Sequence, residues 1–568
     1  MVELSVLLAK IHRNIVLRKI MNFNELLNLV SSDNAPSICI DSRAIGAGDI
    51  FVAVKGTVYD GHDFIDQALA NGAEYIVCQR YQRRTRNEGR GTMFSRHPCG
   101  AGTQQTTGGS LKRVPKDWDE LGDGLLPSIE HRASSIEVID VDDSTEAAAL
   151  LAQAGRGKPA LQLTNLAVTG TNGKTTVAYL VRSCIQKAGQ KCGLIGTVIY
   201  DTCSGDSRQA SLTTPDCLTI AAGQHEMLKN GAKYMVIEAS SHALSQNRLA
   251  GINFKAAAFT NLAGDHLDYH KTEEDYLAAK TRLFSTLSPD AVAVLNKQSP
   301  QAELIAKQTQ ANILWYAIDE PADITAHIES MDTNRTVFTL KYTHQSSIVN
   351  RQSSIVRTPL LGLYNVSNSL AAAGLCLAAG LDLETIAAGL SARQTIPGRL
   401  EKLDWPGDFS VIIDYAHTDD ALKNVLSTLK PLCNGKLRVV FGCGGDRDRT
   451  KRPRMARVAE QLADFIIVTS DNPRTEKPED IIDEIVAGFA SRFSFSTSIE
   501  NPASSIEIII EPDRKKAIEL AIETAGKDDI VLIAGKGHET YQIIGKQKFD
   551  FSDKKIASEY LKKRIRNG

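Results

Sequence analysis

The stretch "LAVTGTNGKTTVAYLV" at residues 166–181 decides the fold class of this chain. An apolar run is followed by a glycine-rich turn and then by a helix-forming segment that begins near Lys174. A turn of this kind directs backbone N–H groups and the positive end of the helix dipole at an anion. We therefore predict a phosphate-binding loop, in which Lys174 neutralises the outer phosphates of a nucleotide and the Thr175 hydroxyl ligates Mg²⁺.

The spacing of this loop departs from the common pattern G-x-x-x-x-G-K-[ST]. That pattern needs a glycine six residues before the lysine, where this chain has Val168. The glycines of the turn are Gly170 and Gly173 instead. The loop is therefore a variant form of phosphate cradle.

Short apolar runs alternate with helical stretches on both sides of the loop, which is the rhythm of parallel βαβ units. A first series of strands is predicted at 166–170, 234–240, 255–262 and 291–297, with a helix at 176–189. After residue 405 a second series has strands at 411–417, 437–445, 465–473 and 529–539, with helices at 419–430, 452–463 and 478–490. Polar residues follow these strands, and ligands bind at that edge of an open α/β sheet.

We expect an α/β protein of three domains. Residues 1–160 form a small N-terminal α/β domain with an insertion at about 81–135, 161–397 a central ATPase-type doubly wound sheet, and 398–568 a C-terminal Rossmann-like domain. A chain of 568 residues has the length for about three domains of ordinary size.

The formal net charge of −2 gives no broad basic field, so nucleic acid is not an expected partner. The ten cysteines show no C-x-x-C pair and are typical of reduced thiols. The N-terminus carries charges every few residues and lacks the apolar run of a signal peptide or membrane span. We expect a cytoplasmic protein without membrane contact.

Three stretches, at 81–124, 345–357 and 491–507, look inserted, and S-S-I recurs in or near them. We interpret them as surface insertions without a catalytic part. The basic "RRTR" at 83–86 has contact with a polyanion as its alternative interpretation.

The sequence "TGTNGKTT" resembles the loop of the Mur ligase family, which are ATP-dependent amide-forming enzymes of cell-wall precursor synthesis, and of the related folylpolyglutamate synthetases. The similarity extends over the chain from about Met21, outside the three insertions, and leaves residues 1–20 as an upstream extension. It implies ATP and Mg²⁺ as cofactors. The expected ATP-binding residues are Gly170, Thr171, Asn172, Gly173, Lys174, Thr175, Thr176, Asn261 and Asn296, with Asn365 and Asn368 in domain packing.

Three further segments resemble the metal and substrate sites of the family: "IEASSHALSQNRL" at 237–249, "TNLAGDHLDYH" at 260–270 and "YLAAKTRLF" at 276–284. The resemblance implies Thr175, Glu238, His266 and a carbamylated Lys280 as metal ligands, with Ser240 and Arg248 at the substrate. Magnesium prefers hard oxygen ligands, and a carbamate turns a lysine cation into a long carboxylate. We expect Lys174, Lys280 and His266 to be catalytic.

Segments "DYAHTDDAL" at 414–422, "FGCGGDRDRTKRP" at 441–453 and "AGKGHE" at 534–539 match the ligases that add the third residue of the peptidoglycan stem peptide. In "SDNPRTEKP" at 470–478, the resemblance assigns Arg474 to the second carboxylate of meso-diaminopimelate. A guanidinium binds a carboxylate through a bidentate pair and repels the bare ammonium of lysine. The other expected residues of this pocket are Arg447, Asp471, Asn472, Gly535 and Glu539, with Glu539 facing an ammonium.

The N-terminal segment around Ser42 resembles the uridine-binding part of the family, and "SLTTPD" at 211–216 its muramoyl-peptide loop, with Thr213 and Thr214. The implied reaction joins meso-diaminopimelate to the D-Glu γ-carboxylate of the UDP-MurNAc dipeptide through an acyl phosphate, and we expect a monomer. The alternatives are the same reaction with L-lysine, a folylpolyglutamate synthetase, and a binding protein that has lost catalysis.

Overall fold

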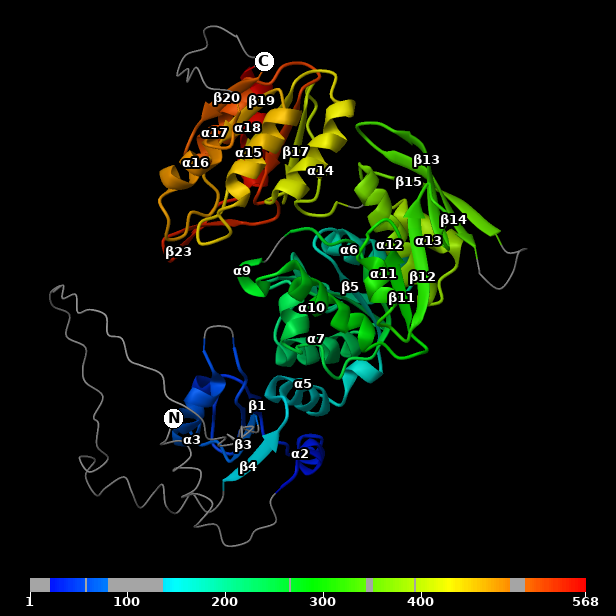
Figure 1. Ribbon diagram of the computed structural model, residues 1–568, viewed down its shortest axis with the longest axis vertical. Helices are drawn as coiled ribbons and strands as arrows, with labels where there is room; N and C mark the ends of the chain where they lie inside the picture. The colour runs from blue at the N-terminus through cyan, green and yellow to red at the C-terminus, as the bar shows by residue number, and fades with distance from the viewer. Residues whose placement is uncertain are drawn as a thin grey trace, which may run out of the picture. The chain divides into compact units, whose positions relative to one another are not determined.

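The computed structural model describes residues 21–56, 59–79, 136–264, 267–343, 351–392, 395–490 and 506–567. The chain forms two compact units (Figure 1). The first ends at Gly155, and the second spans Arg156–Gly568. No helix in the described ranges is long and apolar enough to cross a lipid bilayer.

The first unit is built on a small parallel sheet. Its four strands pair in chain order, each in parallel with the next. Helix α2 starts with a capping box in which the side chains of Asn22 and Glu25 each accept from the other's backbone N–H. The elements are α2 (Phe23–Val30), β1 (Ile38–Cys39), β2 (Ile50–Val52), α3 (Ile65–Ala70), β3 (Tyr75–Gln79), β4 (Glu137–Val141) and α5 (Ser144–Ala154).

The second unit contains a large central sheet in the order β15-β14-β13-β12-β11-β10-β5-β9-β6-β7-β8. Neighbours from β13 to β6 in this order are parallel, and antiparallel strands extend both edges. The strands are β5 (Thr164–Thr169), β6 (Cys192–Ile195), β7 (Ile199–Asp201), β8 (Arg208–Gln209), β9 (Tyr234–Glu238), β10 (Phe254–Phe259), β11 (Val292–Asn296), β12 (Asn312–Ile318), β13 (Ile324–Met331), β14 (Thr336–Thr343) and β15 (Arg351–Thr358).

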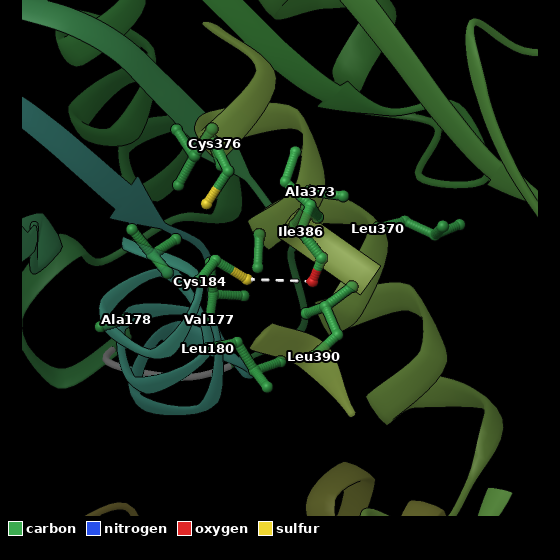
Figure 2. Close-up of a cluster of buried hydrophobic side chains, with 14 of the residues drawn as sticks. Val177, Ala178, Leu180, Cys184, Leu370, Ala373, Cys376, Ile386 and Leu390 are labelled. Carbon is green, nitrogen blue, oxygen red and sulfur yellow. Dashed lines mark hydrogen bonds between the residues drawn. The ribbon is translucent and has the colours of Figure 1, made fainter. Parts of the chain in front are cut away.

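Helices cover both faces of this sheet, because its middle strands are apolar on both sides. On β5, Leu166 and Val168 join the core under α6, α12 and α13, whereas Ala167 joins the core under the helices of the opposite face. Figure 2 shows the first core, where the Cys184 thiol of α6 donates to the Ile386 carbonyl of α13. The helices are α6 (Lys174–Lys187), α12 (Leu363–Ala378) and α13 (Leu383–Leu390), then α7 (Cys217–Lys229), α8 (Ser241–Ser245), α10 (Glu273–Ser285) and α11 (Ala302–Ala306), with the short α9 (Leu267–His270) before α10.

The C-terminal part of the second unit has its own sheet, in the order β16-β17-β21-β18-β19-β20. All neighbours are parallel except β16 and β17. Helices α14 to α16 cover one face and α17 and α18 the other. The elements are β16 (Glu401–Lys402), β17 (Ser410–Asp414), α14 (Asp419–Leu429), β18 (Leu437–Phe441), α15 (Lys451–Leu462), β19 (Phe465–Val468), α16 (Pro478–Val486), β20 (Glu507–Ile510), α17 (Arg514–Glu523), β21 (Ile530–Ala534), the separate hairpin β22 (Tyr541–Ile544) and β23 (Gln547–Asp550), and α18 (Asp553–Asn567).

The α/β class, the two doubly wound sheets and the small N-terminal sheet are confirmed. The interpretation of 345–357 as a surface insertion did not include a strand, but the structure has one in its second half. Residues Arg351–Thr358 form β15, which pairs along its whole length with β14 and buries Val356. Residue 507 of the third stretch starts β20. The first stretch, 81–124, lies outside the described residues.

Candidate active site

The phosphate-binding loop lies between β5 and α6, at the carboxyl edge of the central sheet. Gly170 has φ 146° and Gly173 φ 90°, which are conformations that side chains rarely adopt. Both are also closely packed. A Cβ atom on Gly170 would lie 1.9 Å from Thr260 Oγ1, and one on Gly173 2.2 Å from Asn368 Oδ1. The two glycines are therefore required by the backbone and by their neighbours.

Two lysines meet at this loop. Lys174 Nζ donates to the carbonyl oxygens of Gly170 and Thr171 at 2.9 and 2.8 Å. Lys280 of α10 is 1% exposed, and its Nζ donates to the same Gly170 oxygen at 2.9 Å. Lys280 Nζ also lies 4.2 Å from the centre of the Tyr276 ring. Both cations are thus held beside the loop that would receive the phosphates.

Asparagines and threonines hold the remainder of the loop. Thr171 Oγ1 accepts from the Ala263 N–H at 2.9 Å, and the Asn172 N–H donates to Asn261 Oδ1 at 3.0 Å. Asn296 Nδ2 donates to the Thr260 carbonyl at 2.7 Å, so this asparagine supports the neighbouring strand end. The expected residues Gly170 to Thr176, Asn261 and Asn296 all lie in or next to the loop, with Thr176 buried in the first turn of α6.

Glu238, at the end of β9, faces the start of α6. It is fully buried, and its Oε2 accepts from Thr175 Oγ1 at 2.9 Å. The Thr197 backbone and hydroxyl donate to the same carboxylate at 2.8 and 2.9 Å. This hydroxyl and carboxylate pair suits Mg²⁺, which prefers oxygen ligands.

His266, expected as a metal ligand and catalytic residue, lies outside the described residues. Among the residues that are described, no group of three or more His, Cys, Asp and Glu side chains could hold a metal ion. Thr175 and Glu238 supply the oxygen atoms of the candidate Mg²⁺ site at the start of α6. Lys280 contacts the other end of the phosphate loop, at Gly170.

The expected peptide-binding loop lies beside Glu238. Thr214 Oγ1 donates to the Glu238 carbonyl at 2.6 Å and accepts from the Ser240 N–H at 3.0 Å, while Thr213 Oγ1 is 3.1 Å from Thr197 Oγ1. Arg248 donates to the Thr214 carbonyl at 2.8 Å. Burial lowers the pKa of Arg248 from its usual value. The expected substrate-binding residues thus form one cluster around the end of β9: Thr213, Thr214, Ser240 and Arg248.

Ser42 lies in the first unit, where its hydroxyl donates to Gln67 Oε1 at 2.8 Å. Its side chain is buried within that unit. Ser42 is thus engaged in a local contact with helix α3 of the first unit.

Sequence reasoning missed a group that connects the loop with the C-terminal part. Arg399 Nη2 lies 3.3 Å from Thr175 Oγ1, and its guanidinium lies 4.8 Å from the centre of the Tyr415 ring. The ring of His538 packs 5.2 Å from that of Tyr415. Burial, with a smaller contribution from the Arg399 charge, lowers the pKa of His538 to about 4, so this imidazole is neutral near pH 7.

A second contact joins the same two parts of the chain. Asn172 Nδ2 in the phosphate loop donates to Asp420 Oδ2 of α14 at 2.9 Å. The loop is therefore held by side chains from both the central and the C-terminal part of the second unit.

The carboxyl edge of the C-terminal sheet lines a cavity of about 370 Å³. The strand tails contribute the six residues expected there: Arg447, Asp471, Asn472, Arg474, Gly535 and Glu539. Gly535 has φ 116°, and a Cβ atom there would lie 2.7 Å from Asp471 Oδ2. That carboxylate oxygen is buried and has no hydrogen-bond partner in the described part of the chain.

Two guanidiniums of this cavity donate to backbone oxygens, Arg474 to Gly445 at 2.8 Å and Arg447 to Asp446 at 2.9 Å. Burial lowers the pKa of Arg474 from its usual value, and the neighbouring Arg447 charge lowers it further. A carboxylate placed between the two would relieve this repulsion.

Glu539 was expected to face a substrate ammonium, but it already has a cationic partner within the chain. Lys536 Nζ donates to Glu539 Oε2 at 2.9 Å, and Asn472 Nδ2 donates to the same oxygen at 2.9 Å. The motif "AGKGHE" at 534–539 contains Lys536, but the sequence does not show that Lys536 and Glu539 form an ion pair. The pair depends on how the chain turns between these two residues.

The chain is similar to known proteins over most of its length. Three family models match: "Mur ligase family, catalytic domain" at 36–99, "Mur ligase middle domain" at 168–376 and "Mur ligase, glutamate ligase domain" at 398–537. The UDP-N-acetylmuramoyl-L-alanyl-D-glutamate--2,6-diaminopimelate ligase of Geobacillus kaustophilus is 39% identical over 532 residues, which are 92% of this chain and 94% of that protein.

The protein of the same name from Gloeobacter violaceus is 38% identical over 96% of this chain and 99% of its own length. A solved structure of a ligase with this name is 30% identical, with a TM-score of 0.58, and covers 96% of this chain and 100% of that one.

Proposed function

Because the chain belongs to the Mur ligase family, we propose that it joins meso-diaminopimelate to the D-Glu γ-carboxylate of UDP-N-acetylmuramoyl-L-alanyl-D-glutamate, with ATP hydrolysed to ADP and phosphate. Members of this family use ATP with Mg²⁺. The observation that carries the choice of amino acid is the cavity at the C-terminal sheet, where Arg447 and Arg474 donate only to backbone oxygens in the described residues.

The chemistry of the amino acids supports this choice. The distal end of diaminopimelate carries a carboxylate beside its amine, whereas lysine ends in an amine alone. Arg474 binds the carboxylate through a charge-assisted pair worth about 2–3 kcal/mol, and its charge repels a lone ammonium. We propose that Asp471, with one buried oxygen open, binds an amino group of the same substrate.

The first chemical step is attack of the D-Glu γ-carboxylate on the γ-phosphorus of ATP, which gives an acyl phosphate and ADP. Phosphoryl transfer depends mainly on positioning and charge neutralisation. Lys174, the N–H groups at the start of α6, and Arg399 would hold the phosphates. Thr175 and Glu238 would hold one Mg²⁺ and a carbamylated Lys280 a second, and these ions would neutralise the charge that develops on the phosphate oxygens.

The second step is attack of the amine on the acyl carbonyl, with release of phosphate. The amine must first lose a proton. His266 and a nearby carboxylate are the candidate bases. Thr213, Thr214, Ser240 and Arg248 would hold the peptide of the nucleotide precursor beside Glu238.

We assign residues 1–160 to the UDP end of the precursor, 161–397 to ATP and 398–568 to the amino acid. Ser42 would lie near the uridine. We propose that the protein is a cytoplasmic monomer whose substrates are small molecules. The C-terminal part would close over the phosphate loop during turnover.

The test is ADP release by the purified protein with ATP, Mg²⁺ and the precursor, in the presence of meso-diaminopimelate or L-lysine. We expect turnover with diaminopimelate, a product that contains it by mass spectrometry, and at least about tenfold lower kcat/KM with lysine. Equal kcat/KM for the two amino acids would refute the role of Arg474. ADP release only with a folate and glutamate would refute the proposed reaction.

A further inference from the structure

The hairpin β22–β23 lies beside the segment that carries Arg474. The Arg474 N–H donates to the Ile543 carbonyl at 3.1 Å, and the Gly545 N–H donates to the Arg474 carbonyl at 2.7 Å. Arg474 thus pairs with the end of β22 through both of its backbone groups. This pairing fixes the direction in which its side chain leaves the backbone.

Arg474 needs such support because its φ is 51°. This left-handed conformation is unfavourable for a residue with a Cβ atom, and it persists only where the surroundings enforce it. Gln542 of β22 adds a side-chain contact, because its Nε2 donates to the Asp471 carbonyl at 2.7 Å. The hairpin therefore holds the segment 471–474 at both ends.

Lys536 supports the same segment from a position just before the hairpin. Its side chain is fully buried, and Nζ donates to Asn472 Oδ1 at 3.0 Å and to Glu539 Oε2 at 2.9 Å. Asn472 Oδ1 also accepts from the Ile543 N–H at 2.9 Å. A buried ammonium is stable only with such partners, so Lys536, Asn472 and Glu539 are fixed relative to one another.

Lys536 also limits what Glu539 can do. One carboxylate oxygen already receives Lys536 and Asn472, and the side chain is 14% exposed. Glu539 and Asp471 both line a cavity that also contains Arg447 and Arg474, and Asp471 Oδ2 has no hydrogen-bond partner in the described residues. The two carboxylates can bind an amine while the two guanidiniums bind a carboxylate of the same molecule. This requires that the distances between the four side chains are fixed.

We propose that the hairpin β22–β23 and Lys536 are positioning elements of the amino-acid site, which set Arg474, Asn472 and Glu539 at the spacing that a diamino diacid requires. Neither Lys536 nor Gln542 needs to touch the substrate. This proposal rests on the function proposed above, because it concerns the same cavity.

The test uses the full chain with Lys536→Met or Gln542→Leu, each of which removes hydrogen bonds to the segment 471–474 and keeps a side chain of similar size. We expect KM for meso-diaminopimelate to rise about tenfold, the equivalent of one hydrogen bond to a charged or buried group. The values of kcat, of KM for ATP and of KM for the nucleotide precursor should stay within about threefold of wild type.

The matched control is Lys548→Met on the same hairpin. This lysine is exposed, its Nζ lies 3.5 Å from the centre of the Tyr541 ring, and within the described residues its side chain makes no hydrogen bond to segment 471–474. All kinetic constants of this variant should equal those of wild type. Thermal unfolding of each variant checks its folding, and Gln542→Leu, which removes one partly exposed amide, carries the test if Lys536→Met does not fold.

A similar rise in KM for diaminopimelate, ATP and the nucleotide precursor would overturn the positioning role while the proposed function stands. So would a KM for diaminopimelate that changes no more than it does in Lys548→Met. A wild-type protein without diaminopimelate-dependent ADP release would overturn the proposed function and this proposal together.

Discussion

Gly173 at the start of α6 offers a direct test of the phosphate loop. The change Gly173→Ala places a Cβ atom 2.2 Å from Asn368 Oδ1 and on a backbone with φ 90°. We expect ADP to bind about 100-fold more weakly, because the loop must leave the geometry that directs its N–H groups at the phosphates.

The magnitude follows from two costs. The left-handed conformation costs a residue with a Cβ atom roughly 1–2 kcal/mol. The buried Asn368 amide must also move, and it then loses its hydrogen bond to Asn365 Oδ1, now 3.1 Å long. A buried hydrogen bond is worth about 1 kcal/mol. The sum of about 2–3 kcal/mol corresponds to about 30- to 150-fold in affinity, with about 100-fold inside that range.

The assay is titration calorimetry with ADP and Mg²⁺, accompanied by thermal unfolding. Gly189→Ala is the matched control, since Gly189 follows the other end of α6 with φ 73°, and a Cβ atom added there would have no neighbouring atom within 4 Å. It should lower stability by about 1 kcal/mol and leave ADP affinity unchanged. ADP affinity within about threefold of wild type for Gly173→Ala would refute the reasoning.

Three further predictions concern single side chains. Arg474→Ala should lower kcat/KM for diaminopimelate about 30- to 150-fold, the equivalent of about 2–3 kcal/mol, with KM for ATP unchanged in an ADP-release assay. Glu238→Gln should raise the Mg²⁺ concentration for half-maximal rate at least about tenfold, since it removes an anionic oxygen beside Thr175, and a magnesium titration of the rate measures this. Since His538 has a pKa of about 4 in the folded protein and about 6.5 when unfolded, the unfolded chain binds the extra proton first. The free energy of unfolding should therefore fall as the pH drops from 6.5 towards 4, and His538→Gln should reduce that fall in urea denaturation at pH 7 and pH 5.

Local patterns predicted the parts of the fold that depend on neighbouring residues. Apolar runs of four to six residues before polar tails became β5, β9, β17 and β21, and the helix after Gly173 starts where its glycine turn ends. Strand β15 was missed because its Ser- and Gln-containing sequence has a weak apolar pattern. Pairing with β14 and burial of Val356 define it, and both are long-range effects.

Some residues of the candidate site could likewise be predicted from local motifs, whereas others depend on long-range contacts. Gly170, Lys174 and Thr175 are close in sequence, so their motif could be read directly. The approach of Arg399 to Thr175 joins residues 224 positions apart, and no local spacing indicates it. Lys536 and His538 did carry a signal, since they stand inside "AGKGHE" beside two residues that were selected. Their roles depend on burial, which the motif alone does not give.

The carbonyl oxygen of Gly170 receives the ammonium groups of both Lys174 and Lys280, each at 2.9 Å, so the two charges lie within about 6 Å of each other. At an effective dielectric constant of about 20, two such charges repel by about 3 kcal/mol. In the unmodified protein these two charges face each other at the loop, and either a bound polyanion or carbamylation of Lys280 relieves the repulsion. Nucleotide binding to the unmodified protein should consequently weaken as ionic strength rises, because Lys174 is only partly buried.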